Sequence, residues 1–169
     1  MNKSIVITGM GAVTPYGDGT DKLWQALLEK KSAISEMDLF DLNGIACTKA
    51  GVIRNFIPPA GFENCPRATA FAASACIEAL KQAEIFDSPD ALAETALITA
   101  SNFGNIDFGE RALIPPENPD YEPDKSINCA HSNTATIIAE KLGLKGLCLS
   151  LSLSCASGAS AAEIGRAHV

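Results

Sequence analysis

Short apolar blocks alternate with longer segments of helical spacing along the whole chain. Three blocks are brief, rich in Ile, Val, Leu or Thr, and bounded by turn-forming residues. They predict buried strands at residues 4–8, 95–100 and 147–153. Residues 38–66 are rich in Gly and Pro and predict loops around one short strand near 50–53.

Apolar residues at helical spacing predict the intervening helices. The first should run from an N-cap at Asp21 to about Leu28. Residues 67–86 contain no Gly or Pro and hold many alanines, which predicts a long helix packed closely against its neighbours. Further helices are expected at 134–142, ended by Gly143, and from 159 onward.

Strands that alternate with helices predict an α/β layered domain with a largely parallel sheet. Residues 102–109 and the proline-rich 115–125 are expected to be surface loops. No hydrophilic linker or low-complexity tract divides the chain, so residues 1–169 are taken as one domain unit. The last helical pattern continues to Val169, as expected of a chain cut within a helix.

Composition and charge narrow the classes of function. Hydrophobic residues make up 47% and charged residues 20%, as in soluble globular proteins. The net charge of −7 argues against binding to nucleic acid or to an anionic membrane surface. The N-terminal apolar run, Ile5 to Ile7, is too short for a signal peptide or a membrane span. We therefore expect a cytoplasmic protein.

The six cysteines form no evident metal-binding or disulfide pattern. None of them stands in a C-x-x-C spacing, and the two histidines do not complete a zinc site. No metal and no cofactor are therefore expected. In a reducing compartment most of the cysteines should be free thiols that pack as small buried hydrophobes.

Gly9 and Gly11 follow the first predicted strand and suggest a dinucleotide-binding turn. The third glycine of that motif is missing, however, and Pro15 interrupts the helix that should follow. Phosphate binding here is disfavoured, and we expect a tight turn that ends the strand.

Cys155 differs from the other cysteines in its setting. It follows L-S-L-S-L-S and precedes A-S-G-A-S-A-A, so a strand should turn sharply into a helix of small residues with the cysteine at the turn. Unpaired N–H groups and the positive end of the helix dipole would stabilise a thiolate and could serve as an oxyanion hole. The same pattern also fits a structural cysteine at a crowded crossing, and both interpretations stay open.

The two histidines supply no evident base for Cys155. His131 stands just before a predicted helix start, and His168 lies roughly three and a half helical turns beyond the cysteine. Both are expected to be structural or surface residues, and no Cys-His dyad is assigned.

Several motifs, in order along the chain, resemble the β-ketoacyl-acyl-carrier-protein synthases of the elongating type. The first are I-V-I-T-G-M-G-A-V-T-P-Y-G at 5–17 and L-W-Q-A-L-L-E-K-K-S-A-I-S at 23–35. The others are G-L-K-G at 143–146 and, after a strand, S-C-A-S-G at 154–158. The resemblance covers nearly the whole chain. It implies the N-terminal half of a thiolase-like fold, in which two similar α/β halves stack in alternating layers of helix and sheet.

The resemblance also implies a reaction and a role for Cys155. The thiol would accept an acyl group from an acyl-carrier-protein thioester. A carbanion from decarboxylated malonyl-carrier protein would then take up this group, which gives a β-ketoacyl thioester. In this family two assisting histidines and a lysine lie in the second half of a chain roughly twice as long. Neither His131 nor His168 inherits those roles, so the 169-residue chain alone is expected to be inactive.

The same resemblance suggests further site residues. Asn102 and Phe103 fall near the positions that line the acyl pocket, and Gly104 matches the glycine-rich loop of the family. Arg67 is a candidate for docking the acidic acyl-carrier protein, with a solvated arginine at a helix end as the alternative. A homodimer is implied, and neither a nucleic acid nor a membrane is expected as a partner.

Two other functions stay open. A non-catalytic partner subunit that sets chain length would share the fold, although the retained Cys155 favours the active kind. A thiolase acting on coenzyme A thioesters would also share the fold but is associated with a different cysteine context. The sequence leaves open the choice between fatty acid and polyketide synthesis, and the preferred acyl chain.

Overall fold

A small parallel sheet lies at the centre of the structure, a computed structural model that describes residues 4–106 and 133–167. Strand β5 (Leu97–Ala100) pairs with β6 (Cys148–Leu151), and the two strands run in the same direction. Leu97 lies opposite Cys148, and Ala100 lies opposite Leu151. Both strands are short and half-buried, and the chain between them passes through a helix, as parallel pairing requires.

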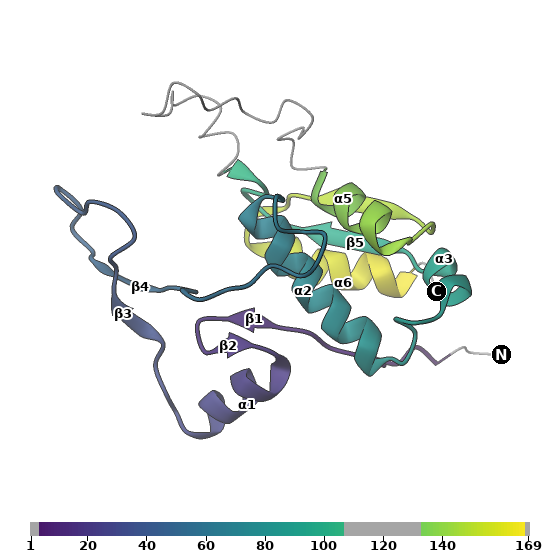
Figure 1. Cartoon of the computed structure of the whole chain (residues 1–169), viewed down its shortest axis with the longest axis horizontal. Coiled ribbons are helices and arrows are strands. Elements are labelled where there is room, and N and C mark those ends of the chain that lie inside the picture. Colours follow the sequence, from purple (N-terminus) through teal and green to yellow (C-terminus); the bar gives the residue numbers. More distant parts are fainter. Residues whose placement is uncertain (1–3, 107–132, 168–169) are drawn as a thin grey trace.

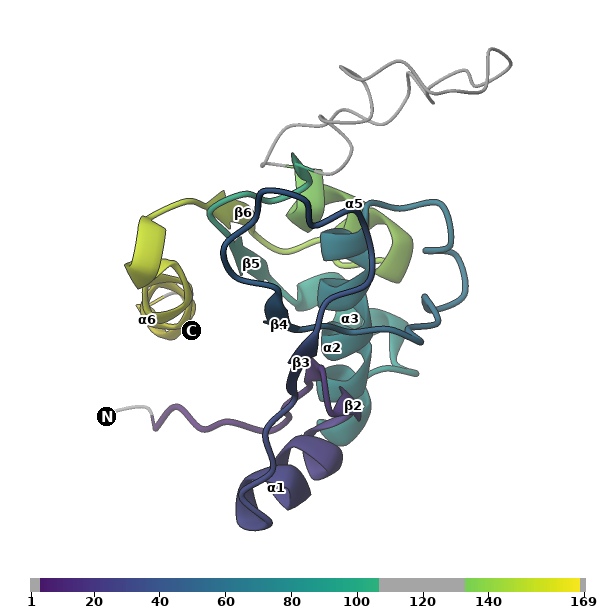
Figure 2. The same cartoon turned by 90° about the vertical axis from the view of Figure 1, so that its left-hand side faces the viewer.

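Helices cover both faces of this sheet (Figures 1 and 2). Helices α2 (Arg67–Gln82) and α5 (Asn133–Leu142) pack together on one face, and α6 (Ser157–Ala167) packs on the other. The predicted α/β layering is confirmed for the described residues, with three layers in the order helix, sheet, helix.

The core lies between α2, α5 and the sheet. Phe62, Ala73 and Ile138 are fully buried there, and the small side chains along α2 let α5 approach closely. Partly buried hydrophobic residues complete this cluster: Cys65, Ala72, Cys76, Ile77, Leu97, Ile137 and Leu142.

The first third of the chain is built from two small hairpins and a helix. Strands β1 (Val13–Thr14) and β2 (Gly17–Asp18) form the first hairpin, which leads into α1 (Thr20–Leu28). Strands β3 (Ile34–Glu36) and β4 (Lys49–Gly51) form the second, which extends away from the body as an arm (Figure 1). The short helix α3 (Pro89–Glu94), with Ser88 as its N-cap, precedes β5. Of these elements, only α1 and a strand near β4 were predicted.

The predicted strand at residues 4–8 is wrong. These residues have no regular secondary structure, and the side chains of Val6 and Ile7 are 72% and 84% exposed. A strand is stable only when a neighbour completes its hydrogen bonds, and no described segment pairs with this one. Its apolar residues therefore lie on the surface of the described chain.

Gly9 and Gly11 do not form the expected turn, and instead pass very close to the backbone of α2. A Cβ atom on Gly11 would lie 1.9 Å from the carbonyl oxygen of Ala75, and one on Gly9 would lie 2.1 Å from that of Ala79. Only glycine lets two backbones approach this closely. The paired glycines are therefore packing residues.

The predicted N-cap at Asp21 is also wrong. Helix α1 begins at Thr20, Gly19 occupies the N-cap position, and Asp21 lies inside the first turn. Glycine has no side chain to bond the first N–H groups of the helix. The Glu78 carboxylate of α2 takes that place, because it accepts from the Thr20 N–H at 2.8 Å and from the Thr20 hydroxyl at 3.0 Å.

The remaining elements agree with the prediction in type and differ in length. The long helix ends at Gln82 instead of 86, and Glu84 just beyond it has a left-handed φ of 61°. Gly143 ends α5 with a φ of 74°, as expected of a helix-terminating glycine. Some predicted features lie outside the described residues: the 115–125 loop, Cys129, His131 and His168.

Candidate active site at Cys155

The turn that carries Cys155 joins β6 to α6. The chain leaves the sheet after Leu151, makes one turn of 3₁₀ helix, η1 (Ser154–Ala156), and enters α6 at Ser157. Cys155 is the middle residue of η1, and its side chain is exposed. The expected sharp transition from strand to helix is therefore present, with the thiol at its apex.

The backbone N–H groups that follow the thiol are not all free. The Ala156 N–H donates to the Leu153 carbonyl at 3.1 Å, and the Ser157 N–H donates to the Ser154 carbonyl. Helix α6 itself begins only at Ser157, two residues beyond Cys155. The thiol thus lies near a helix N-terminus, as predicted. The 3₁₀ turn, however, pairs two of the N–H groups that we expected to be free.

The other cysteines fall into two groups. Cys47 and Cys148 are exposed, which departs from the expectation that most cysteines are buried. Cys65 and Cys76 are half-buried beside the core, and burial raises the pKa of both thiols. Cys148 is therefore the informative comparison for Cys155, because both thiols are exposed and only Cys155 lies in the turn.

A cavity of about 440 Å³ lies between α2 and the sheet. Its walls are mostly apolar, with Phe71 and Cys76 on the helix side and Ile98 and Leu151 on the strand side. Ser101 and Gly104 contribute at its edge, whereas Asn102 and Phe103 are not among its lining residues. Both of these side chains are exposed, and Phe103 is 67% exposed. Their predicted place in an acyl pocket stays a prediction.

A buried polar cluster anchors the loop after β5, and the sequence did not predict it. Asn105 is 1% exposed, and its Oδ1 accepts from the hydroxyls of Thr69 at 2.8 Å and Thr134 at 3.3 Å. These threonines belong to α2 and α5, so the amide connects the loop to both helices. Thr69 and Thr134 lie in the first turns of α2 and α5, and the sequence gives no signal that they are buried or that Asn105 joins them.

Arg67 lies at the first position of α2 and is exposed but engaged. Its guanidinium donates to the carbonyl of Ile53 and lies 4.8 Å from the centre of the Phe71 ring. Phe71 in turn packs edge-on against Phe56 at 4.7 Å. The simple alternative of a solvated helix-end arginine therefore understates its contacts, because it connects α2 to the segment after β4.

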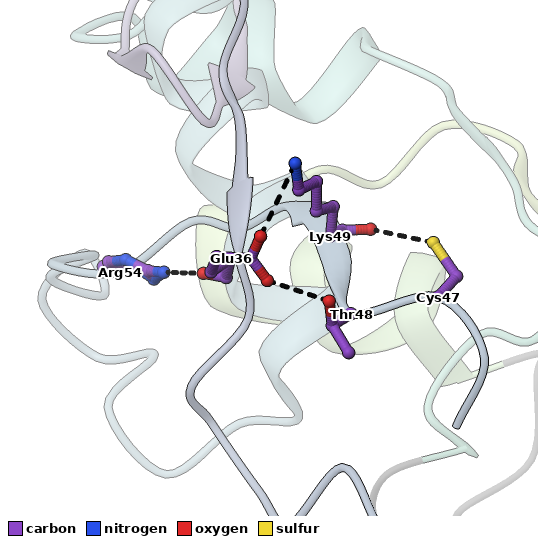
Figure 3. A network of polar contacts seen from close by, with 5 residues as sticks. All are labelled: Glu36, Cys47, Thr48, Lys49 and Arg54. Carbon is purple, nitrogen blue, oxygen red and sulfur yellow. Dashed lines mark hydrogen bonds and ion pairs between the residues drawn. The ribbon is translucent and has the colours of Figure 1, made fainter. Parts of the chain in front are cut away.

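The arm formed by β3 and β4 carries an exposed polar network (Figure 3). Glu36 accepts from the Thr48 hydroxyl at 2.8 Å and lies 3.5 Å from the Lys49 ammonium, while Arg54 donates to the Glu36 carbonyl at 2.8 Å. The Cys47 thiol lies 3.6 Å from the Lys49 carbonyl. The pattern joins opposite strands of the hairpin, and it holds the arm together without forming a reactive site.

The described residues offer neither a candidate metal site nor a membrane-spanning helix. No group of three or more His, Cys, Asp or Glu is placed to hold a metal ion in residues 4–106 and 133–167. None of the helices in these ranges is both long enough and apolar enough to cross a membrane.

Known proteins resemble this chain over most of its length. The 3-oxoacyl-[acyl-carrier-protein] synthase 2 of Vibrio harveyi is 24% identical over 168 residues, which cover 92% of this chain and 40% of that protein. The tetracenomycin polyketide synthase ketoacyl synthase beta subunit of Streptomyces glaucescens is 30% identical over 114 residues, or 64% of this chain and 28% of that protein. The chain thus spans about 40% of the length of the first of these relatives.

The fold has solved counterparts. The ishigamide ketosynthase/chain length factor structure superposes with a TM-score of 0.76 at 20% identity, over 97% of this chain and 44% of that one. Residues 2–168 match the family described as "Beta-ketoacyl synthase, N-terminal domain". Because this match covers almost every residue, the chain belongs to the beta-ketoacyl synthase family and has the thiolase-like fold of its N-terminal domain.

Proposed function

We propose that this chain is the N-terminal half of a β-ketoacyl-acyl-carrier-protein synthase of the elongating type, with Cys155 as its acyl-accepting nucleophile. The observation that carries the proposal is the exposed thiol in the turn between β6 and α6. Family membership gives that position a chemical role that an isolated exposed cysteine would not have. The enzyme would be an acyltransferase of fatty acid or polyketide synthesis that acts in the cytoplasm, where reducing conditions keep the thiol free.

The chemistry divides into two transfers. The Cys155 sulfur attacks the carbonyl carbon of an acyl-carrier-protein thioester, the acyl–sulfur bond to the carrier breaks, and the carrier thiolate leaves and takes up a proton. Malonyl-carrier protein then loses carbon dioxide, and the resulting carbanion attacks the acyl-cysteine carbonyl. This step forms the new carbon–carbon bond and releases the Cys155 thiolate. The groups that promote decarboxylation are proposed to lie outside these 169 residues.

Other residues are proposed to bind the substrates. Asn102 and Phe103 would meet the acyl chain, and their exposure in the described chain leaves them available for contact. Arg67 would contact the acidic carrier protein, since it is exposed at the start of α2. No cofactor is proposed, and the enzyme is proposed to act as a homodimer.

The test measures two reactions of Cys155 in the full-length protein. These are its acylation by a thioester and its alkylation, for which Cys148 is the comparison thiol. An acyl-carrier-protein thioester should add one acyl group, mapped by mass spectrometry to Cys155, and the addition should be lost in Cys155→Ala. Iodoacetamide should modify Cys155 faster than Cys148, which is also exposed, and Cys76 should react slowest because burial raises its thiol pKa. In the same assay Arg67→Ala should raise the KM for the carrier protein.

The alternatives give different outcomes. If Cys155 is neither acylated nor alkylated faster than Cys148, the nucleophile is lost and a non-catalytic partner subunit becomes the better explanation. The superposed ishigamide structure is a ketosynthase/chain length factor, which makes that alternative concrete. If coenzyme A thioesters acylate Cys155 as fast as carrier-bound ones, a thiolase-like enzyme is favoured instead.

A further inference from the structure

The hydroxyl of Ser157 bridges the backbone on the N-terminal side of Cys155. The Leu153 N–H donates to the Ser157 Oγ at 2.9 Å, and the Ser157 hydroxyl donates to the Ser154 carbonyl at 2.8 Å. The Ser157 N–H donates to the same carbonyl. One residue, the first of α6, therefore closes a ring of hydrogen bonds around the peptide that carries the thiol.

This bridge supports a backbone conformation that would not persist by itself. Ser154 has a left-handed φ of 51°, a region in which a residue with a side chain is strained. Strand β6 ends at Leu151, so the sheet offers no partner to the Leu153 N–H or the Ser154 carbonyl. Ser157 satisfies both groups, and it can do so because its side chain is buried against the turn.

Ser157 is one of the few buried polar residues of the described chain. Ser157 is 7% exposed, and within the described residues it is the one buried polar side chain apart from the cluster formed by Thr69, Asn105 and Thr134. Removing the hydroxyl takes away the partner that the Leu153 N–H and the Ser154 carbonyl share within the turn. The cysteine itself stays exposed on the other side of the turn.

We infer that Ser157 is the positioning residue of the nucleophile: its hydroxyl holds the strained 153–157 turn in the geometry that presents the Cys155 thiol to the thioester. This role rests on the proposed function of Cys155. The simpler alternative is that Ser157 only starts α6 and adds general stability. The two differ in what happens to acyl transfer when the protein stays folded.

The experiment uses three single variants of the full-length protein. Ser157→Ala removes the hydroxyl, Ser157→Thr restores one at the same atom, and Ser160→Ala makes the same change one turn later in α6, where no backbone bridge is present among the described residues. The measured quantities are kcat and KM for acylation of Cys155 by an acyl-carrier-protein thioester. The iodoacetamide rate of Cys148 and the circular dichroism spectrum report on folding.

We expect Ser157→Ala to lower kcat by about tenfold with KM unchanged, in line with the loss of the two hydrogen bonds that the hydroxyl makes to Leu153 and Ser154. Ser157→Thr should recover most of the rate, and Ser160→Ala should keep it. Cys148 should be alkylated at the same rate in all three variants. A Ser157→Ala enzyme that acylates within twofold of the parent, or a Ser160→Ala enzyme that is equally impaired, overturns the positioning role.

A double variant distinguishes a positioning role of Ser157 from a general loss of stability. Glycine adopts a positive φ without strain, so Ser154→Gly should make the turn less dependent on the bridge. Ser157→Ala should then lower kcat clearly less in the Ser154→Gly background than in the parent. If the two substitutions lower kcat independently of each other, Ser157 contributes only general stability. If the parent enzyme is not acylated at Cys155 by an acyl-carrier-protein thioester, it is the proposed function that fails, whatever the Ser157 variants show.

Discussion

At the scale of single residues, glycines mark where two backbones meet. Gly11 crosses α2 at Ala75, and a methyl group there would overlap the carbonyl oxygen at 1.9 Å. Gly158 in α6 has open space around its Cβ position. The two glycines therefore serve different purposes, although the sequence shows both only as glycine among small residues.

We predict that Gly11→Ala destabilises the protein by about 2–3 kcal/mol, because the backbone of α2 cannot move away from the added methyl without disturbing the core. Gly158→Ala is the matched control, and it should be neutral or stabilise by up to about 1 kcal/mol, since alanine is the better helix former. Urea unfolding followed by circular dichroism measures both. Equal effects in the two variants would contradict the close crossing.

Residue identity also explains why part of the site was predictable. The exposed Cys155 follows from a local pattern, an alternating strand that runs into a stretch of small residues. Ser157 lies in the same stretch, but nothing in the sequence separates it from Ser160. Its bridge depends on the left-handed φ of Ser154, which only the folded turn shows.

At the scale of elements, α2 holds the beginning of the chain in place. Glu78 accepts hydrogen bonds from Thr20 at the start of α1 and from the Ala12 N–H at 2.9 Å, and Gln82 accepts from the Met10 N–H. These two acceptors stand one turn apart on α2. They give the backbone of residues 10–20 the partners that a strand would otherwise supply.

The pKa of Glu78 follows from this arrangement. Partial burial by itself would raise the pKa, but the hydrogen bonds from the Thr20 and Ala12 N–H groups and from the Thr20 hydroxyl outweigh it and lower the pKa. A carboxyl group with a lowered pKa in the folded state stabilises the protein above its unfolded pKa of about 4.3. That contribution is lost as the pH falls through the lower folded value.

We predict that Glu78→Gln lowers the free energy of unfolding by about 1 kcal/mol at neutral pH, since the amide keeps one acceptor oxygen and loses the charge. The difference from the parent should shrink as the pH falls through the lowered pKa of Glu78 in the folded state, because the parent carboxyl then becomes protonated as well. Glu94→Gln is the control, because Glu94 is exposed at the end of α3. A difference that is independent of pH would show that ionised Glu78 is not the cap of α1.

The elements themselves were predictable to different degrees. Helix α5 and strand β5 could be predicted because their apolar periodicity and flanking residues are local signals, such as Gly143 after α5. The hairpin of β3 and β4 was missed because each strand has three residues, too few to show a period. Its register depends on pairing between Ile34 and Gly51, far apart in the sequence.

At the scale of the whole molecule, apolar surface gathers in the first third of the chain. Trp24, Leu27 and Leu28 of α1 are each more than half exposed, and they follow one another at helical spacing. Val6 and Ile7, in the N-terminal segment, are exposed as well. The chain contains a single tryptophan, so its fluorescence reports on this helix alone.

We predict that Trp24 of the 169-residue chain is quenched by acrylamide nearly as strongly as free tryptophan, because 62% of the residue is exposed. Leu80→Trp in a Trp24→Phe background supplies a half-buried comparison on α2, and it should be quenched clearly less. Protection of Trp24 that disappears on dilution would indicate self-association through α1. Protection at every concentration would contradict the exposure of this face.

The sequence by itself determined the alternation of helices and strands, the family, and the cysteine at the turn. These depend on short-range periodicity and on motifs whose residues are close along the chain. Only the tertiary structure decided that residues 4–8 have no strand partner in the part of the chain that it describes, that Gly9 and Gly11 are packing residues, and that Glu78 caps α1. Each of these features joins segments about 60 to 75 residues apart or needs a neighbouring strand, so no local pattern could report it.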